Sequence, residues 1–537
     1  MTRMPRLLAL GLVPGAFLAI MLLAPLLRIL LEGWANAPAG LIATMWHDDY
    51  LRWRVLWSLL QAALTCVLAL LLGLPVAWVL ARYRFAGRSL VLRLLMLPFV
   101  VPPLVAALGV LALWGPRGLV SGWFTPLGFD VGTALEGTPW LLLYGNLFFN
   151  LCLVVRAGVD ALSQVSASRL AAARSLGATP WRAFWRVEWP ASLPWLASAL
   201  CLVFLYCFAG FGLALLLGGQ RYATVEVEIY TLVAHELKLA EAGVLGLCMV
   251  LLTGGVALAY GLVEKRLATP VRFDAIALQQ PVRPLQQALL AAALGVLFVF
   301  CAAPLLAVVW RALAGGAAAW AVLLDDELWQ ALWNTLRFSA LALALATLLG
   351  LAHALAARRS VWLRTAAFLP FVVSPVTVAF GLLLLYPGWT ASLPLLIAAY
   401  ALLAYPFVAK AVAAALDGLP ASVLQVARTL GAPPGRVFWR VTLPLLAPAL
   451  RRGMAFAAAT VLGEFAVTLF LSRPEWATLT TLIYQRLGQP GANNLASALV
   501  LACLLMGLSL LVFIGIEGRG EPAARGAQLR APGAAHA

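Results

Sequence analysis

Two segments of the chain place arginines beside aromatic residues in the same order. Residues 177–190 read GATPWRAFWRVEWP and residues 431–444 read GAPPGRVFWRVTLP, with nine identical residues in fourteen and an offset of 254. Aromatic and arginine side chains that are exposed together typically anchor a protein partner. A single segment of this kind could equally lie among lipid headgroups as an interfacial helix. Two copies with the same spacing favour a partner that binds twice, so we predict two equivalent docking sites.

The local sequence predicts how these segments fold. Helix-forming residues precede each segment and end at a glycine, the residue that commonly follows a helix C-terminus. Thr179 can cap a second helix with Pro180 at its first position, and Pro433 and Pro434 play a comparable part in the second copy. We expect this second helix to be short and to end at Pro190.

The sequence contains no pattern for binding ATP or a metal, or for forming disulfides. The three lysines follow Leu, Glu and Ala, so the phosphate-binding loop that ends in Gly-Lys is absent. The seven cysteines are odd in number and lie in apolar segments without C-x-x-C spacing, which indicates packing roles. The four histidines are scattered. We expect no cofactor or metal in this chain, and any ATP would have to be bound by a separate subunit.

Glu464 is the one acid that we place well inside a late apolar segment. Exposing an ionisable side chain to lipid costs about 2.5–3.5 kcal/mol, so such a residue usually faces a cavity or a partner. In one interpretation the carboxylate packs against a neighbouring helix. In the other, Glu464 lines a pathway with Tyr206, Phe211 and Phe465, and these side chains attract a cationic aromatic substrate.

The elements that position these residues are membrane helices. The chain is 64% hydrophobic and 11% charged with a mean hydropathy of +0.96, which leaves too little polar surface for a soluble domain of this length. Apolar runs near the ~20 residues that span a bilayer recur a dozen times. We predict an all-α integral membrane fold with spans at 7–31, 56–80, 94–114, 139–160, 194–217, 242–263, 286–310, 333–356, 366–386, 391–413, 447–471 and 494–516.

The first span has the outline of a secretion signal, because Arg3 and Arg6 precede it and Ala35-Asn36-Ala37 follows it. Its apolar run exceeds the ~7–15 residues that are typical of the apolar core of a signal peptide. We therefore expect an uncleaved anchor helix.

The distribution of charge predicts the orientation. If the N-terminus is inside, 27 of the 37 Lys and Arg and 7 of the 21 acids lie on the inner side. Positive charge accumulates in the cytoplasmic loops of membrane proteins, so both termini are expected to be cytoplasmic. The basic residues are spread over short separate loops, which argues against nucleic-acid binding.

The chain is an internal duplication. The offset of 254 extends from Arg156 and Lys410 to Tyr230 and Tyr484 without a gap. Upstream, LPFVVPP at 97–103 matches LPFVVSP at 369–375, and Gly73 matches Gly350 with a shifted offset. We predict two parallel six-span halves at 1–263 and 286–516, a cytoplasmic linker at 264–285 and a cytoplasmic tail at 517–537.

The duplicated segments resemble the E-A-A-x-x-x-G loops of ABC importer permeases. In that family the short helix after the glycine docks on a cytoplasmic ATPase, with one ATPase for each loop. The Glu of the motif is replaced by Ala171 in the first loop and by Gln425 in the second, which puts any ionic contact of that Glu in doubt. The resemblance assigns ATPase coupling to Ala171, Gly177, Pro180, Arg182, Phe184, Trp185, Arg186 and Pro190 and to Gln425, Gly431, Pro434, Arg436, Phe438, Trp439, Arg440 and Pro444.

The fusion of two permease halves resembles the branch that contains thiamine and ferric-iron importers. FFNLCLVVRAGVDAL at 148–162, GEFAV at 463–467 and LIYQRLG at 482–488 look closest to the thiamine permease. This resemblance implies a bacterial inner-membrane permease, two cytoplasmic ATP-binding subunits and an external substrate-binding protein. The alternatives are a ferric-iron permease, a secondary transporter with parallel halves, and an integral-membrane enzyme, for which the spans lack convergent catalytic groups.

Overall fold

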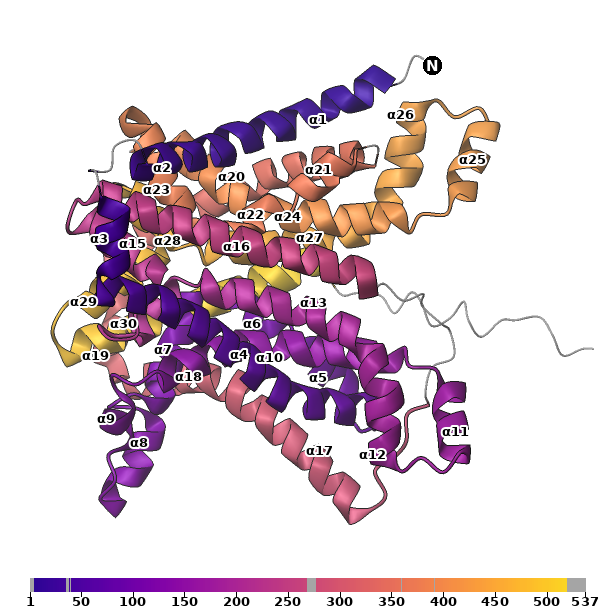
Figure 1. Ribbon diagram of the computed structural model, residues 1–537. Helices are drawn as coiled ribbons and strands as arrows, with labels where there is room; N and C mark the ends of the chain where they lie inside the picture. Colours follow the sequence, from indigo (N-terminus) through magenta and orange to yellow (C-terminus); the bar gives the residue numbers. More distant parts are fainter. Residues whose placement is uncertain are drawn as a thin grey trace, which may run out of the picture.

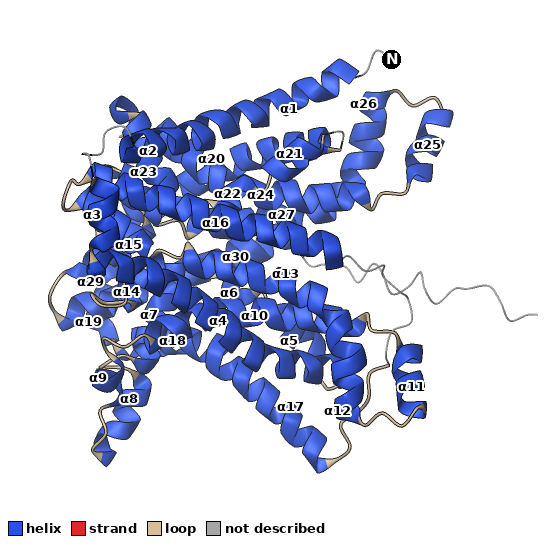
Figure 2. Ribbon diagram, in the orientation of Figure 1, coloured by secondary structure: helices blue, strands red, loops and turns tan. Residues whose placement is uncertain are grey.

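The computed structural model describes residues 4–34, 38, 40–267, 277–358, 360–390 and 392–518 of the chain. Helices account for nearly all of these residues, and within these ranges no β-strand occurs (Figure 1; Figure 2). An isolated β-bridge joins Tyr83 to Gln279. The prediction of an all-α fold is confirmed.

The helices fall into two series that repeat the same order. The first series consists of α1 (Met4–Leu18), η1 (Ala19–Leu23), α2 (Ala24–Trp34), α3 (Leu41–His47), α4 (Asp49–Arg82), α5 (Arg88–Leu94), α6 (Leu97–Val100), α7 (Pro103–Trp114), α8 (Leu119–Phe124), η2 (Thr125–Leu127), α9 (Val131–Leu135), α10 (Trp140–Ser163), α11 (Ala167–Ser175), α12 (Pro180–Ala183), η3 (Phe184–Glu188), α13 (Trp189–Phe208), α14 (Gly212–Leu217), α15 (Val225–Ala234) and α16 (Leu239–Leu267). The second consists of α17 (Pro284–Leu297), η4 (Phe298–Ala302), α18 (Ala303–Ala314), α19 (Gly316–Trp320), η5 (Ala321–Leu324), α20 (Asp326–Ala357), α21 (Val361–Ala366), α22 (Leu369–Val372), α23 (Pro375–Leu385), η6 (Pro387–Trp389), α24 (Leu393–Asp417), α25 (Ala421–Thr429), α26 (Pro434–Val437), η7 (Phe438–Thr442), α27 (Leu443–Leu462), α28 (Ala466–Leu471), η8 (Pro474–Trp476), α29 (Leu479–Gly488) and α30 (Ala492–Glu517).

The number of spans agrees with the prediction, although several of them are not single straight helices. In the described ranges, 11 helices are long and apolar enough to cross a membrane, or up to 12 if a bent pair counts as one span. That pair replaces the predicted span 366–386 and bends by 96° between Trp362–Val372 and Pro375–Leu385. The predicted span 94–114 is divided between α6 and α7, because Pro102 and Pro103 force the residues before them into extended backbone.

The predictions of continuous spans at 194–217 and 447–471 were wrong. The first helix ends at Phe208 and the second at Leu462, and a short helix follows each break. Glycines at both breaks, Gly210 and Gly463, weaken the helix there. Each half therefore has irregular backbone inside an apolar segment, and at Gly463 this backbone lies against Pro102 of the first half.

Close contacts confirm the repeat residue by residue. A Cβ added at Gly73 would meet Val154 Cγ1 at 3.0 Å, and one added at Gly350 would meet Val408 Cβ at 2.7 Å. These two glycines were aligned from the sequence, and each lets a long helix approach the next one in its own half. The hydroxyl of Ser58 likewise accepts the N–H of Val225 at 2.9 Å, a contact that Thr335 and Leu479 repeat at 2.9 Å.

The two halves exchange their first helices. Helix α1 packs on α20 of the second half, and α17 packs on α4 of the first. The exchange brings two pairs of helices equally close. A Cβ added at Gly109 of α7 would lie 2.7 Å from the carbonyl oxygen of Pro304 in α18, and one added at Gly381 of α23 would lie 2.9 Å from the carbonyl oxygen of Pro25 in α2. Each half is therefore held by a helix of the other.

The halves differ most at one end of the molecule. Helices α8 and α9 project from the first half beside α18, on the left in Figure 1, whereas the second half has only η6 at the corresponding place. The predicted linker and tail lie partly outside the described residues, and the described chain continues α16 to Leu267 and ends at Gly518. The boundaries of the halves stay a prediction.

Candidate functional sites: paired loops and a cavity between the halves

The two arginine- and tryptophan-containing segments lie at one end of the molecule. Figure 1 shows α11 and α12 at the lower right and α25 and α26 at the upper right, the end at which the chain begins. Helices α3, α9 and α19 lie at the opposite end. The loops thus form a matched pair of surfaces facing the same side, as two equivalent docking sites would require.

The turn chemistry predicted for the loops is confirmed. Gly177 and Gly431 adopt φ angles of +80° and +76°, which a residue with a side chain rarely adopts. In the first loop the hydroxyl of Thr179 accepts the N–H of Arg182 at 3.4 Å, and Pro180 is the first residue of α12. In the second loop Pro434 begins α26. The glycine therefore sets the angle between the two helices of each loop.

The prediction that Pro190 ends a short helix was wrong. A continuous helical stretch runs from Pro180 to Phe208, and its counterpart runs from Pro434 to Leu462. Each contains a π-helical turn, η3 or η7, that finishes two residues before a proline. Widening the turn accommodates a residue that lacks an N–H and whose ring would clash with the preceding turn of an α-helix. The exposed loop is consequently joined without a break to α13 or α27.

The most exposed apolar residues of the loops are two leucines that sequence reasoning missed. Leu176 and Leu430 expose 88% and 81% of their surface and directly precede Gly177 and Gly431. The duplication could have indicated these leucines, because both occupy the same position of the repeat, in SLG at 175–177 and in TLG at 429–431. An apolar side chain held in solvent at both equivalent positions is suited to burial in a partner.

The predicted loop residues divide into exposed ones and one partly buried pair. Phe184 and Phe438 are half-buried, and the ring of Phe184 packs against Trp181 and Trp185 at 6.4 and 5.5 Å between centroids. These phenylalanines hold the aromatic cluster together and do not form its outer surface. The exposed members are Ala171, Gly177, Pro180, Arg182, Trp185, Arg186 and Pro190 in the first loop and Gln425, Gly431, Pro434, Arg436, Trp439, Arg440 and Pro444 in the second.

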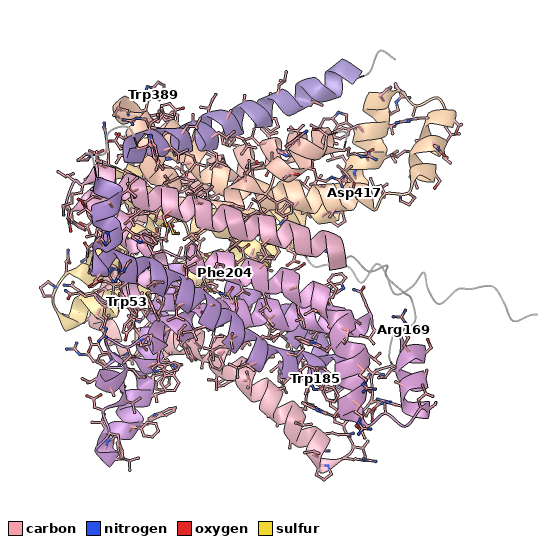
Figure 3. The ribbon with its side chains drawn as sticks, viewed as in Figure 1. Trp53, Arg169, Trp185, Phe204, Trp389 and Asp417 are labelled. Atoms are coloured by element: carbon pink, nitrogen blue, oxygen red, sulfur yellow. The ribbon has the colours of Figure 1, made fainter. Side chains whose placement is uncertain are left out.

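Figure 3 shows the environment of these loops. Arg169 extends from α11 at the outer edge of the first loop, and Trp185 lies on the adjoining helix. Asp417 lies where α24 ends beside the second loop, and its carboxylate accepts a hydrogen bond from Arg364 at 3.1 Å. The loop surfaces therefore combine arginines with aromatic rings, as their sequence indicated.

A buried ion pair connects the first loop to its own half. The carboxylate of Glu188, in η3, lies 2.7 Å from Arg82 Nη2 and accepts the indole N–H of Trp78 at 3.1 Å. Both charged side chains are buried. The second half has Thr442 in place of Glu188, so this link between α4 and the loop belongs to one half.

A cavity of about 320 Å³ lies between the halves, and the four predicted pathway residues all line it. Tyr206 and Phe211 come from the first half, and Glu464 and Phe465 from the second. The rings of Phe211 and Phe465 stack with centroids 5.9 Å apart. The structure thus brings together residues that are separated by about half the chain.

Glu464 lies in the break between α27 and α28. Its Oε1 accepts the N–H of Val467 at 2.9 Å, so the carboxylate caps the short helix that follows. The side chain is buried yet contributes to the cavity wall. The carboxylate therefore bonds within its own segment and not to a neighbouring helix, and the residue also forms part of the cavity wall. Its role in a substrate pathway stays a prediction.

Sequence reasoning missed two amides that line the same cavity. Asn146 and Asn150, both on α10, line the cavity and are buried. Their signal was a pair of amides one helical turn apart within an apolar span, where polar side chains usually face a pathway or another helix. The remaining wall is largely apolar and includes the rings of Phe99, Phe149, Phe407 and Phe456.

Comparisons with known proteins place these features in context. Residues 69–269 and 346–517 match the family described as binding-protein-dependent transport system inner membrane component. The thiamine transport system permease protein ThiP of Escherichia coli (strain K12) is 29% identical over 525 residues, which cover 94% of this chain and 96% of that protein. The corresponding protein of Brucella abortus (strain 2308) is 30% identical over 532 residues, covering 94% and 95%. A solved structure, the crystal structure of a bacterial alginate ABC transporter in complex with an alginate pentasaccharide-bound periplasmic protein, matches at 16% identity and a TM-score of 0.41. The match covers 49% of this chain and 94% of that one.

Proposed function

The chain belongs to the family of binding-protein-dependent transport system inner membrane components, and we propose that it imports thiamine with energy supplied by a separate ATPase. The proposal of thiamine is supported by the similarity to the thiamine transport system permease proteins of Escherichia coli and Brucella abortus, which align over 94% of the chain. The observation that carries it is the cavity, where a carboxylate lies among stacked aromatic rings from both halves.

The cavity suits an organic aromatic cation. A positively charged ring is attracted both by the carboxylate of Glu464 and by the faces of Phe211 and Phe465. A volume of about 320 Å³ is at the lower end of the range for small-molecule sites and admits a molecule with two rings. A ferric ion would require several oxygen ligands, and Glu464 is the only carboxylate among the cavity's lining residues, so the cavity favours thiamine over iron.

Coupling to ATP hydrolysis takes place at the paired loops. Two copies of a cytoplasmic ATP-binding subunit dock on the surfaces around Leu176 and Leu430, one on each loop. Because each loop continues into α13 or α27 without a break, a movement of the ATPase is transmitted directly to the breaks beside the cavity. This route alternately opens the cavity to the two sides of the membrane.

The remaining partners follow from the orientation. The docking loops and both termini face the cytoplasm of a bacterial cell, in line with the positive charge of the inner loops. An external substrate-binding protein delivers thiamine at the opposite end, where α3, α9 and α19 lie. No nucleic acid takes part.

Uptake by the reconstituted complex tests this function. The chain is placed in proteoliposomes with its ATP-binding subunit and its substrate-binding protein, and accumulation of labelled thiamine is followed. We expect uptake that requires ATP on the side of the loops and the binding protein on the other. Uptake that follows an ion gradient and ignores ATP would indicate a secondary transporter and refute the proposal.

A further inference from the structure

Asn150 has an unused hydrogen-bond acceptor on the wall of the cavity. The residue is 3% exposed and lines the cavity. Its Nδ2 donates to the backbone carbonyl of Asn146 at 2.8 Å and to Cys207 Sγ at 3.2 Å, whereas its Oδ1 has no hydrogen-bond partner. A buried amide oxygen is normally paired, so an unpaired one at a cavity requires an explanation.

The orientation of this amide is determined by its neighbours. A backbone carbonyl can only accept a hydrogen bond, so the nitrogen of Asn150 must face Asn146 and the oxygen must be the free atom. Asn146 is itself held by donating to Gln61 Oε1 at 2.7 Å. The free acceptor is therefore preorganised.

The fold does not require amides at these positions. In the second half, at the offset of 254, Tyr400 replaces Asn146 and Ala404 replaces Asn150. Both replacements are fully or almost fully buried in the equivalent helix, α24. An alanine thus satisfies the packing at the equivalent place, and no contact within the protein accounts for the acceptor oxygen of Asn150.

We propose that Asn150 Oδ1 is a substrate-binding group that accepts a hydrogen bond from an amine carried by the transported aromatic cation, an inference that rests on the proposed function. Thiamine has one ring with a permanent positive charge and a second ring with an exocyclic amine. The second half supplies a carboxylate for the charge, and the first half supplies an acceptor for the amine. The two halves thereby recognise different ends of one substrate.

Discrimination between thiamine and oxythiamine tests this role. In oxythiamine a carbonyl oxygen replaces the exocyclic amine, so the exocyclic position changes from donor to acceptor while the charged ring stays. Uptake of both compounds is measured with the complete reconstituted complex carrying Asn150→Ala. Alanine is chosen because the second half has an alanine at the equivalent position. The same binding protein is used with the wild type and the variant. Its own preference for one substrate therefore cancels when the ratios of thiamine uptake to oxythiamine uptake are compared between the two complexes.

We expect the ratio to fall about five- to tenfold in Asn150→Ala, the effect of losing one hydrogen bond, with oxythiamine uptake little changed. Asn150→Asp keeps an oxygen acceptor and should preserve the ratio. Asn150→Leu, which is close in size to asparagine and has no acceptor, should lower the ratio as alanine does and provides a second variant if the alanine form does not assemble. Tyr405→Phe is the matched control, since the Tyr405 hydroxyl is buried and unpaired but does not line the cavity.

Three results would overturn the inference. An unchanged ratio in an assembled Asn150→Ala complex would show that Oδ1 does not contact the amine, while the proposed function would stand. An equal fall in both substrates would assign Asn150 to folding or packing. If the wild-type complex transports no thiamine under any condition, the proposed function and this inference fall together.

Discussion

The exposed leucines of the two loops allow a quantitative test of ATPase docking. The perturbation is Leu176→Ala, Leu430→Ala and the double variant. Both residues lie in solvent at the end of a short helix and have few contacts to lose, so the permease itself should insert and fold normally. Any effect should then arise in binding.

The magnitude follows from the exposed surface. Leu176 and Leu430 are 88% and 81% exposed, so docking can bury nearly the whole side chain. Burying a leucine contributes about 1.5–3 kcal/mol, and most of this is lost when it is shortened to alanine. A loss of about 2 kcal/mol corresponds to roughly 30-fold weaker binding at each loop. The free energies should add in the double variant, because the loops are separate sites.

The assay is the affinity of the purified ATP-binding subunit for the permease in lipid nanodiscs. The matched control is Leu324→Ala, since Leu324 in η5 is 86% exposed but lies at the opposite end of the molecule. Affinity should be unchanged in the control and reduced in both single variants. Wild-type affinity in the double variant would refute the assignment of these loops as docking sites.

Three further predictions follow from the geometry. Glu464→Gln keeps the shape and removes the charge, so uptake of thiamine at low concentration should fall while ATPase assembly persists; undiminished uptake would leave Glu464 as a helix cap alone. Glu188→Ala leaves the buried guanidinium of Arg82 without its partner, and breaking a buried ion pair in this way typically destabilises a protein by about 3–5 kcal/mol. Thermal unfolding in detergent should therefore occur at a lower temperature in Glu188→Ala. The double variant Arg82→Leu with Glu188→Thr removes both charges and should partly restore the unfolding temperature. If the single and double variants unfold alike, the ion pair does not hold the loop. Cysteines introduced at Gly122 and Gly435 test the orientation, because both positions have room for a side chain. The cysteine at 122 should react with an impermeant thiol reagent added outside intact cells, and the cysteine at 435 should not. Labelling at 435 would show that the predicted orientation is reversed.

The sequence was sufficient for the periodic and repeated features. Long apolar runs predict membrane helices because a bilayer excludes every other backbone arrangement except a closed barrel. The duplication was readable because Gly73 and Gly350 each have a structural reason to be small, namely the approach of Val154 or Val408. Local turn chemistry at Thr179 was equally readable, since a cap depends on neighbours within one turn.

The wrong predictions of helix ends concern segments in which a proline or a glycine can either interrupt a helix or be accommodated within it. Pro190 was expected to end a helix, and instead the helix passes through it by means of the π-turn η3. The apolar stretch that includes Phe211 was expected to continue as a helix, yet α13 ends at Phe208. Packing against other helices decides between these outcomes, and that information lies far away in the sequence.

The sequence by itself determined the class of protein, the duplication and the surface chemistry of the loops, because each depends on composition or on residues within a few turns. Only the tertiary structure decided that Leu176 is more exposed than Phe184, that the halves exchange their first helices, and that Asn150 shares a cavity with Glu464. These relations join residues hundreds of positions apart. No local pattern encodes them, because they arise from how whole helices pack.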